Sequence, residues 1–243
     1  MKHLPKINPF YWALVISANT MGETAGDLIS QTFNLGYGGG TIALLFLLFV
    51  AIALSIYSKS QKPFLYWTVI TLASTAGTTI SDFISRTLGF GYILSTLLLL
   101  FLLSFTFYIW KWFSKVDPIN EGLNKTTEFL YWICILSSST LGTAFGDLLA
   151  HDTPLGFDFG TLFLLALLII VVALDYFSNW SKTLIYWLAI ILTHPIGATI
   201  GDYMTKPEGM NLGNSNASLI LVFVFILVIA IRKFTLQKSK SHN

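Results

Sequence analysis

Charge is the first thing that this sequence lacks. Only 11% of its 243 residues are Asp, Glu, Lys or Arg, whereas a soluble domain has about 25%. This shortage excludes an ordinary cytosolic enzyme and a nucleic-acid-binding protein, because both need many exposed charges. Cysteine is scarce as well. The single Cys134 excludes a disulfide framework or a thiolate metal site within one chain, and we expect it to be a small core residue.

Apolar residues, by contrast, make up 54% of the chain. They fall in blocks that are long enough for membrane-spanning helices of about 20 residues each. Eight such spans would leave only short loops, so we expect no soluble domain. The sequence has no nucleotide-binding motif, no HExxH-type motif and no nucleophile–base set. We therefore expect neither an enzyme nor a cofactor.

Four copies of one motif organise the chain. Tyr-Trp pairs recur at residues 11–12, 66–67, 131–132 and 186–187. Each Trp is followed by a Gly after ten residues and by an Asp after fifteen, and the aligned cores read GETAGD, GTTISD, GTAFGD and GATIGD. We place the repeats at 10–58, 64–115, 129–180 and 184–234. A turn-rich linker at 115–125 joins the two halves.

Each repeat holds two apolar segments, which predicts a single all-α transmembrane domain of eight helices over residues 1–243. All four repeats are expected to enter the membrane in the same orientation. Of the fourteen basic residues, only Arg86 and Lys206 lie in loops within repeats. By the positive-inside rule, both termini are expected in the cytoplasm. The Trp of each pair is predicted to be an interfacial anchor: Trp12, Trp67, Trp132 and Trp187.

The two helices of a repeat differ in polarity. The first contains an acid, which costs about 2.5–3.5 kcal/mol at mid-membrane, and the second is almost purely apolar. We therefore expect an inner ring of first helices surrounded by the second ones. Small residues four positions apart would let the inner helices approach closely. These pairs are Gly22 and Gly26, Gly77 and Ser81, Gly142 and Gly146, and Gly197 and Gly201.

Polar residues on each first helix recur every four positions, so they share one helical face. Four such faces would line a polar axis. The repeated Asp residues would form a ring near its outer end, or would only hold each helix–loop junction together. Glu23 and His194 break the repeat and are stronger functional candidates, although a helix kink at Pro195 also explains a histidine there. The candidate ion-binding residues are Asn19, Glu23, Asp27, Thr78, Asp82, Thr143, Asp147, His194 and Asp202.

With these motifs the sequence resembles the bacterial membrane proteins built from domain of unknown function 347. The resemblance covers residues 10–234 and rests on Tyr66-Trp67 with residues 77–82 and on Tyr131-Trp132 with residues 142–147. It implies four tandem two-helix repeats in a bacterial inner membrane, and it supplies no substrate. The fourth repeat departs from the pattern at His194 and Ala198, which puts four equivalent sites in doubt.

The sequence thus predicts a small transporter for a cation, foremost a divalent metal ion such as Mn²⁺, with Glu23, Asp27 and Asp147 as metal ligands. Oxygen-rich ligand sets suit hard or borderline ions, and acid-rich axes also relay protons, which would allow proton coupling. No basic residue within the membrane is clearly placed to neutralise these acids, and Arg86 either pairs with Asp82 one turn away or only marks the outer interface. Export is the expected direction.

Two alternatives stay open. One is a transporter or channel for an organic cation, in which the aromatic residues would matter more. The other is a structural or regulatory membrane protein without transport activity, whose Asp residues only stabilise the fold. The expected partners are the lipid bilayer and a cation, with no nucleic acid. The axis lies within one chain or is completed by a homodimer.

Overall fold

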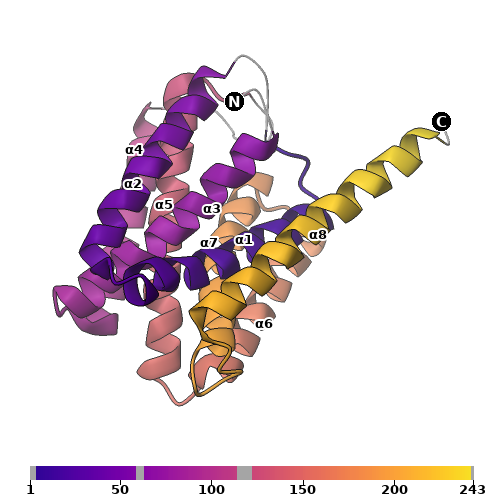
Figure 1. Ribbon diagram of the computed structural model, residues 1–243. Coiled ribbons are helices and arrows are strands. Elements are labelled where there is room, and N and C mark those ends of the chain that lie inside the picture. The colour runs from indigo at the N-terminus through magenta and orange to yellow at the C-terminus, as the bar shows by residue number, and fades with distance from the viewer. Residues whose placement is uncertain (1–3, 59–62, 114–121, 242–243) are drawn as a thin grey trace.

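The computed structural model describes residues 4–58, 63–113 and 122–241, and side chains up to Ile231 (Figure 1). Within these ranges the chain forms eight α-helices and no strand. The π-helical turns η1 (Leu28–Thr32) and η2 (Phe83–Thr87) follow the first and third helices. Most of the linker predicted at 115–125 lies outside the described residues. The helices are α1 (Pro9–Asp27), α2 (Gly36–Tyr57), α3 (Pro63–Asp82), α4 (Gly91–Phe113), α5 (Lys125–His151), α6 (Gly156–Phe177), α7 (Lys182–Thr205) and α8 (Gly213–Ser241).

A glycine begins the second helix of every repeat. Its φ is positive each time, in the left-handed region that residues with a β-carbon rarely adopt. The turn within each repeat therefore has the same physical cause in all four copies. These residues are Gly36, Gly91, Gly156 and Gly213, with φ of 67°, 67°, 64° and 69°.

Helices α1, α3, α5 and α7 form a closed inner ring. Both α1 and α5 pack against α3 and against α7. The second helix of each repeat packs on the inner helix of the following repeat, as α2 on α3, α4 on α5 and α6 on α7, and α8 returns to α1 (Figure 1). The inner helices are largely buried and the outer helices are largely exposed. The predicted division into inner and outer helices is thus confirmed, and the ring closes within one chain.

Six of the described helices, α2 and α4 to α8, are long and apolar enough to cross a membrane. The chain is therefore an all-helical membrane protein, as predicted. Helices α1 and α3, with 19 and 20 residues, are shorter than the other two inner helices, α5 and α7, with 27 and 24 residues. That α1 and α3 also span the membrane stays a prediction.

The inner helices approach one another too closely for side chains at their glycines. Because packing, rather than hydrophobicity, holds helices together in lipid, this close approach supports the ring. The small residues predicted to pack lie at these close approaches, and the same contact recurs at all four interfaces. A β-carbon would lie 2.3 Å from Ser74 Oγ at Gly22, 2.5 Å from Ser139 Oγ at Gly77, 2.3 Å from His194 Cβ at Gly142 and 2.5 Å from Asn19 Cβ at Gly197. One turn further along the helices, a β-carbon added at Gly26, Gly146 or Gly201 would lie 2.9, 3.2 or 2.9 Å from a side chain of the neighbouring helix. Ser81, the equivalent residue of the second repeat, is fully buried.

Four buried tyrosines form a closed ring of hydroxyl groups at the end of the inner helices where these begin. The sequence shows the Tyr-Trp pairs but does not reveal this ring. A hydroxyl can donate one hydrogen bond and accept another, so a cyclic arrangement satisfies all four phenols. The oxygen–oxygen distances are 2.7 Å for Tyr11–Tyr66, 3.0 Å for Tyr66–Tyr131, 2.7 Å for Tyr131–Tyr186 and 2.9 Å for Tyr186–Tyr11.

The tryptophans next to these tyrosines pack around the hydroxyl ring. Trp67, Trp132 and Trp187 are only 5%, 0% and 8% exposed. Each one contacts the tyrosine of its own repeat and that of the preceding repeat, with ring centroids 4.9 to 5.7 Å apart. The prediction of interfacial anchors is therefore wrong for these three residues, because their rings face the core. Trp12 is partly exposed.

The glycine contacts lead to a first prediction. Gly77→Val should prevent close packing of α3 on α5, since its β-carbon would also lie 2.9 Å from the Thr140 backbone nitrogen. We expect a loss of about 1–3 kcal/mol or more in the free energy of unfolding. Size-exclusion chromatography of the detergent-purified protein after heating gives its melting temperature, which reports this loss of stability. Gly39→Val is the matched control, because a β-carbon there meets only Leu35 at 3.8 Å. Equal melting temperatures would contradict the packing role.

Candidate functional site

The polar residues predicted to line the axis are all buried in the inner ring. Their side chains come from α1, α3, α5 and α7, so the four repeats contribute to one site. No residue of the set is more than 4% exposed: Asn19, Glu23, Asp27, Thr78, Asp82, Thr143, Asp147, His194 and Asp202.

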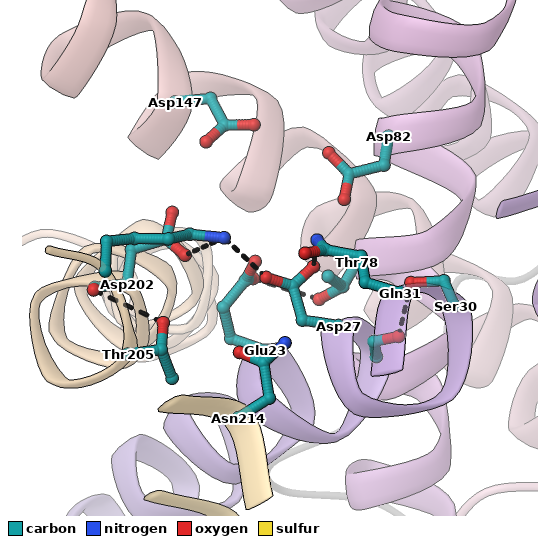
Figure 2. Close-up of polar contacts among 12 residues, drawn as sticks. Glu23, Asp27, Ser30, Gln31, Thr78, Asp82, Asp147, Asp202, Thr205 and Asn214 are labelled. Atoms are coloured by element: carbon teal, nitrogen blue, oxygen red, sulfur yellow. Dashed lines mark hydrogen bonds and ion pairs between the residues drawn. The ribbon is translucent and has the colours of Figure 1, made fainter. Parts of the chain in front are cut away.

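Glu23 lies at the level of the axis where the later repeats have Thr78, Thr143 and Ala198. Its Oε2 accepts hydrogen bonds from the Thr78 and Thr143 hydroxyls, both at 2.9 Å. Its carboxylate also interacts electrostatically with the four repeated Asp residues, which Figure 2 shows around it. No Lys or Arg of the described residues forms an ion pair with Glu23. Glu23 is therefore a buried carboxylate that accepts hydrogen bonds from two hydroxyl groups and forms no ion pair within the described residues.

The four repeated Asp residues, in contrast, are bridged in pairs. Arg86 Nε lies 2.8 Å from Asp82 Oδ1, and its Nη2 lies 3.4 Å from Asp147 Oδ2. Lys206 Nζ lies 2.6 Å from Asp27 Oδ2 and 3.3 Å from Asp202 Oδ1.

These bridges correct one expectation. The two basic residues in the loops within repeats form ion pairs with all four Asp residues and offset part of their charge, whereas the sequence offered only Arg86 and Asp82 as a pair. Each is four residues after one Asp, so it lies one helical turn away. Each also reaches the Asp of a neighbouring inner helix: Asp147 for Arg86 and Asp27 for Lys206. The second contact depends on how the helices pack, and the sequence did not indicate it.

The protonation of the bridging groups follows from their neighbours. Burial lowers the pKa of the Lys206 ammonium, but the charges of Asp202 and Asp27 outweigh it and raise that pKa above its ordinary value. The pKa of Arg86 is raised in the same way by Asp82 and Asp147 against the effect of burial. A raised pKa means that the stabilisation by Lys206 is complete at neutral pH and is lost only as the pH rises through that higher pKa.

The metal site predicted from the sequence is not formed in this structure. Among the described residues, no three His, Cys, Asp or Glu side chains are grouped so that they could hold a metal ion. The predicted ligands Asp27 and Asp147 are instead in contact with Lys206 and Arg86. The third, Glu23, forms no ion pair within the part of the chain that the structure describes.

His194 lies at the level of Asn19, one turn from Glu23 towards the tyrosine ring. Helix α7 continues through Pro195, so the histidine stands within a helix.

Sequence reasoning missed two further polar contacts. The Gln31 amide donates to Asp27, and a fully buried Glu128 accepts a hydrogen bond from Ser55 at 2.6 Å. Glu128 lies three residues before the repeated Tyr131, where no other repeat has an acid, and this departure is the signal that could have indicated it.

The bridges give a second prediction. Lys206→Ala would leave Asp27 and Asp202 buried without a cation, and we expect a loss of about 3 kcal/mol in the free energy of unfolding. Lys182→Ala is the matched control, because its contact with Asp175 has the same 2.6 Å distance but is exposed, and exposed pairs contribute at most about 1 kcal/mol. Chemical unfolding in detergent measures both. Equal losses in the two variants would refute a structural role for the bridge.

Comparison with known proteins bears out the repeat organisation. A family model described as Repeat of Unknown Function (DUF347) matches the chain four times, at residues 10–61, 65–115, 130–180 and 185–237. These segments agree with the four repeats predicted from the Tyr-Trp, Gly and Asp spacing. No curated protein and no solved structure matches the chain. Because the four matches cover most of its length, the chain belongs to the family of proteins built from the DUF347 repeat.

Proposed function

We propose that this protein is a membrane transporter that moves a cation along the axis of the inner ring, with Glu23 as the carboxylate that binds it. One observation supports this proposal above all. Glu23 is the buried axial acid that has no ion pair among the described residues, while each of the four Asp residues contacts Arg86 or Lys206.

The charges of the axis favour a cation over an anion. Five carboxylates meet two basic side chains there, so the acids are in excess. A buried charge without a counter-charge is costly, and acids inside membrane proteins commonly mark ion pathways or proton relays. A metal ion, an organic ammonium or a proton at Glu23 would reduce this excess. An anion would increase it.

We propose the same orientation for all four repeats, with both termini in the cytoplasm of a bacterium and the protein in its inner membrane. The four tyrosines meet at one end of the inner helices, and the four Asp residues gather towards the other, which supports a common orientation. The basic residues support the cytoplasmic termini. The two exceptions, Arg86 and Lys206, have their own function in the Asp bridges.

The ends of the axis suggest two gates. The hydroxyl ring of Tyr11, Tyr66, Tyr131 and Tyr186 closes the end proposed to be cytoplasmic. The bridges made by Arg86 and Lys206 connect the inner helices at the opposite end. A cation reaches Glu23 from either side only when the contacts at that side open, and opening them alternately would produce transport.

Glu23 provides a third prediction. Glu23→Gln and Glu23→Thr should reduce cation uptake into proteoliposomes about 100-fold, which corresponds to a loss of about 2.7 kcal/mol in cation binding. Glu23→Thr copies the residue of the second and third repeats at this level and should fold. Its melting temperature should rise, because an unpaired buried charge is removed.

Glu208→Gln is the control for this experiment, since Glu208 is exposed in the connection between α7 and α8. Unchanged uptake in both Glu23 variants would eliminate the proposed function. A lower melting temperature for Glu23→Thr, together with no uptake in the wild type, would favour a structural role for the axial acids.

The hydroxyl ring provides a fourth prediction. Tyr66→Phe removes two of the four hydrogen bonds and leaves Tyr11 and Tyr131 each short of a partner. We expect a loss of about 1–3 kcal/mol in the free energy of unfolding and a higher passive leak of cations through proteoliposomes. Tyr176→Phe, at an exposed tyrosine of α6, should change neither. A leak that stays at the wild-type rate would show that the ring is not a gate.

A further inference from the structure

One turn of the axis from Glu23, four equivalent residues form a polar layer: Asn19, Ser74, Ser139 and His194. All four are buried. The Ser74 hydroxyl donates to the Asn19 carbonyl oxygen at 3.3 Å, and the Ser139 hydroxyl donates to the Ser74 carbonyl oxygen at 3.3 Å. Each serine is thus satisfied by the inner helix of the preceding repeat.

His194 does not follow this pattern. Neither its Nδ1 nor its Nε2 has a hydrogen-bond partner among the described residues, and the same holds for Oδ1 of Asn19. The Asn19 amide nitrogen donates to Thr193 Oγ1, next to His194, at 3.3 Å. Buried polar atoms in native proteins nearly always have partners, so unpaired ones in a single layer require an explanation. A ligand that binds in this layer would provide the missing partners of these atoms.

The unpaired atoms belong to α1 and α7, the two helices that pack against each other at Asn19 and Glu23. Asn19 precedes Glu23 by four residues, so both side chains lie on one face of α1. Helix α7 packs directly on α1 at both levels, since a β-carbon would lie 2.5 Å from Asn19 Cβ at Gly197 and 2.9 Å from Glu23 Cβ at Gly201. Helices α1 and α7 therefore offer a carboxylate, an amide oxygen and an imidazole at adjacent levels of the axis.

The imidazole decides which cation suits this set. Mg²⁺ and Ca²⁺ take oxygen ligands, whereas imidazole nitrogen suits first-row transition metals such as Co²⁺ and Zn²⁺. We infer that the transported cation is a divalent transition-metal ion, which binds His194, Asn19 and Glu23 and completes its coordination with water. This inference rests on the proposed function and names its substrate class. The ligand set differs from the three carboxylates predicted from the sequence.

Transport by the purified full-length protein in proteoliposomes tests the inference. Uptake of Co²⁺, Mg²⁺ and K⁺ is compared between the wild type and His194→Ser, which copies the serine of two other repeats. We expect Co²⁺ uptake to fall at least about tenfold in the variant. A wild type that moves Mg²⁺ or K⁺ but not Co²⁺, or equal Co²⁺ uptake in both proteins, would overturn the inference alone. A wild type that moves no cation would overturn the proposed function.

Binding gives a second measurement that does not depend on transport. Co²⁺ added to the detergent-purified wild type should produce visible absorption bands of nitrogen-coordinated cobalt. These bands should disappear in His194→Ser and in His194→Asn, which copies the first repeat. His151→Ser should keep them, because His151 lies at the end of α5, outside the layer. If folded His194 variants retain the wild-type bands, the imidazole is not a ligand and the inference is refuted.

Discussion

Close contact between the inner helices is the constraint on which the rest of this structure depends. Lipid supplies no hydrophobic force between helices, so they must pack backbone against backbone. Gly22, Gly77, Gly142 and Gly197 make this possible, one at each of the four interfaces. The closed ring then holds the polar faces away from lipid, and each outer helix packs on the inner helix of the next repeat around the ring. Without that approach, neither the tyrosine ring nor the acidic bridges could form.

The ring also explains how a chain with so little charge holds several acids in its interior. Two loop residues, Arg86 and Lys206, each bridge Asp residues of two inner helices. These bridges join α3 to α5 and α7 to α1, so they act as electrostatic links around the ring. The repeated Asp residues thus help to hold the fold together, while Glu23 stands apart from their ion pairs.

Departures from the repeat are where the structure leaves polar groups uncompensated. Where the other repeats have Thr or Ala, the first repeat has Glu23, a buried carboxylate that forms no ion pair with the residues the structure describes. Where two repeats have a hydrogen-bonded serine, the fourth has His194, whose ring nitrogens have no hydrogen-bond partner among the described residues. The other copies show that the fold forms with Thr or Ser at these positions. The cost of a buried unpaired group then has a functional explanation rather than a structural one.

The sequence by itself determined the four repeats, the pairs of helices, the inner position of the polar helices and the packing role of their small residues. These features follow from spacing along one chain segment and from the cost of polar groups in lipid, both of which are readable locally. The tertiary structure alone decided the contacts between repeats. These are the hydroxyl ring, the packing that buries Trp67, Trp132 and Trp187, and the ion pairs of Arg86 with Asp147 and of Lys206 with Asp27. Each of these joins residues of different repeats, so it depends on which helices are neighbours and how far they are rotated. The metal site expected from Glu23, Asp27 and Asp147 is not formed among the described residues for the same reason, because Arg86 and Lys206 reach Asp147 and Asp27 from the ends of other helices.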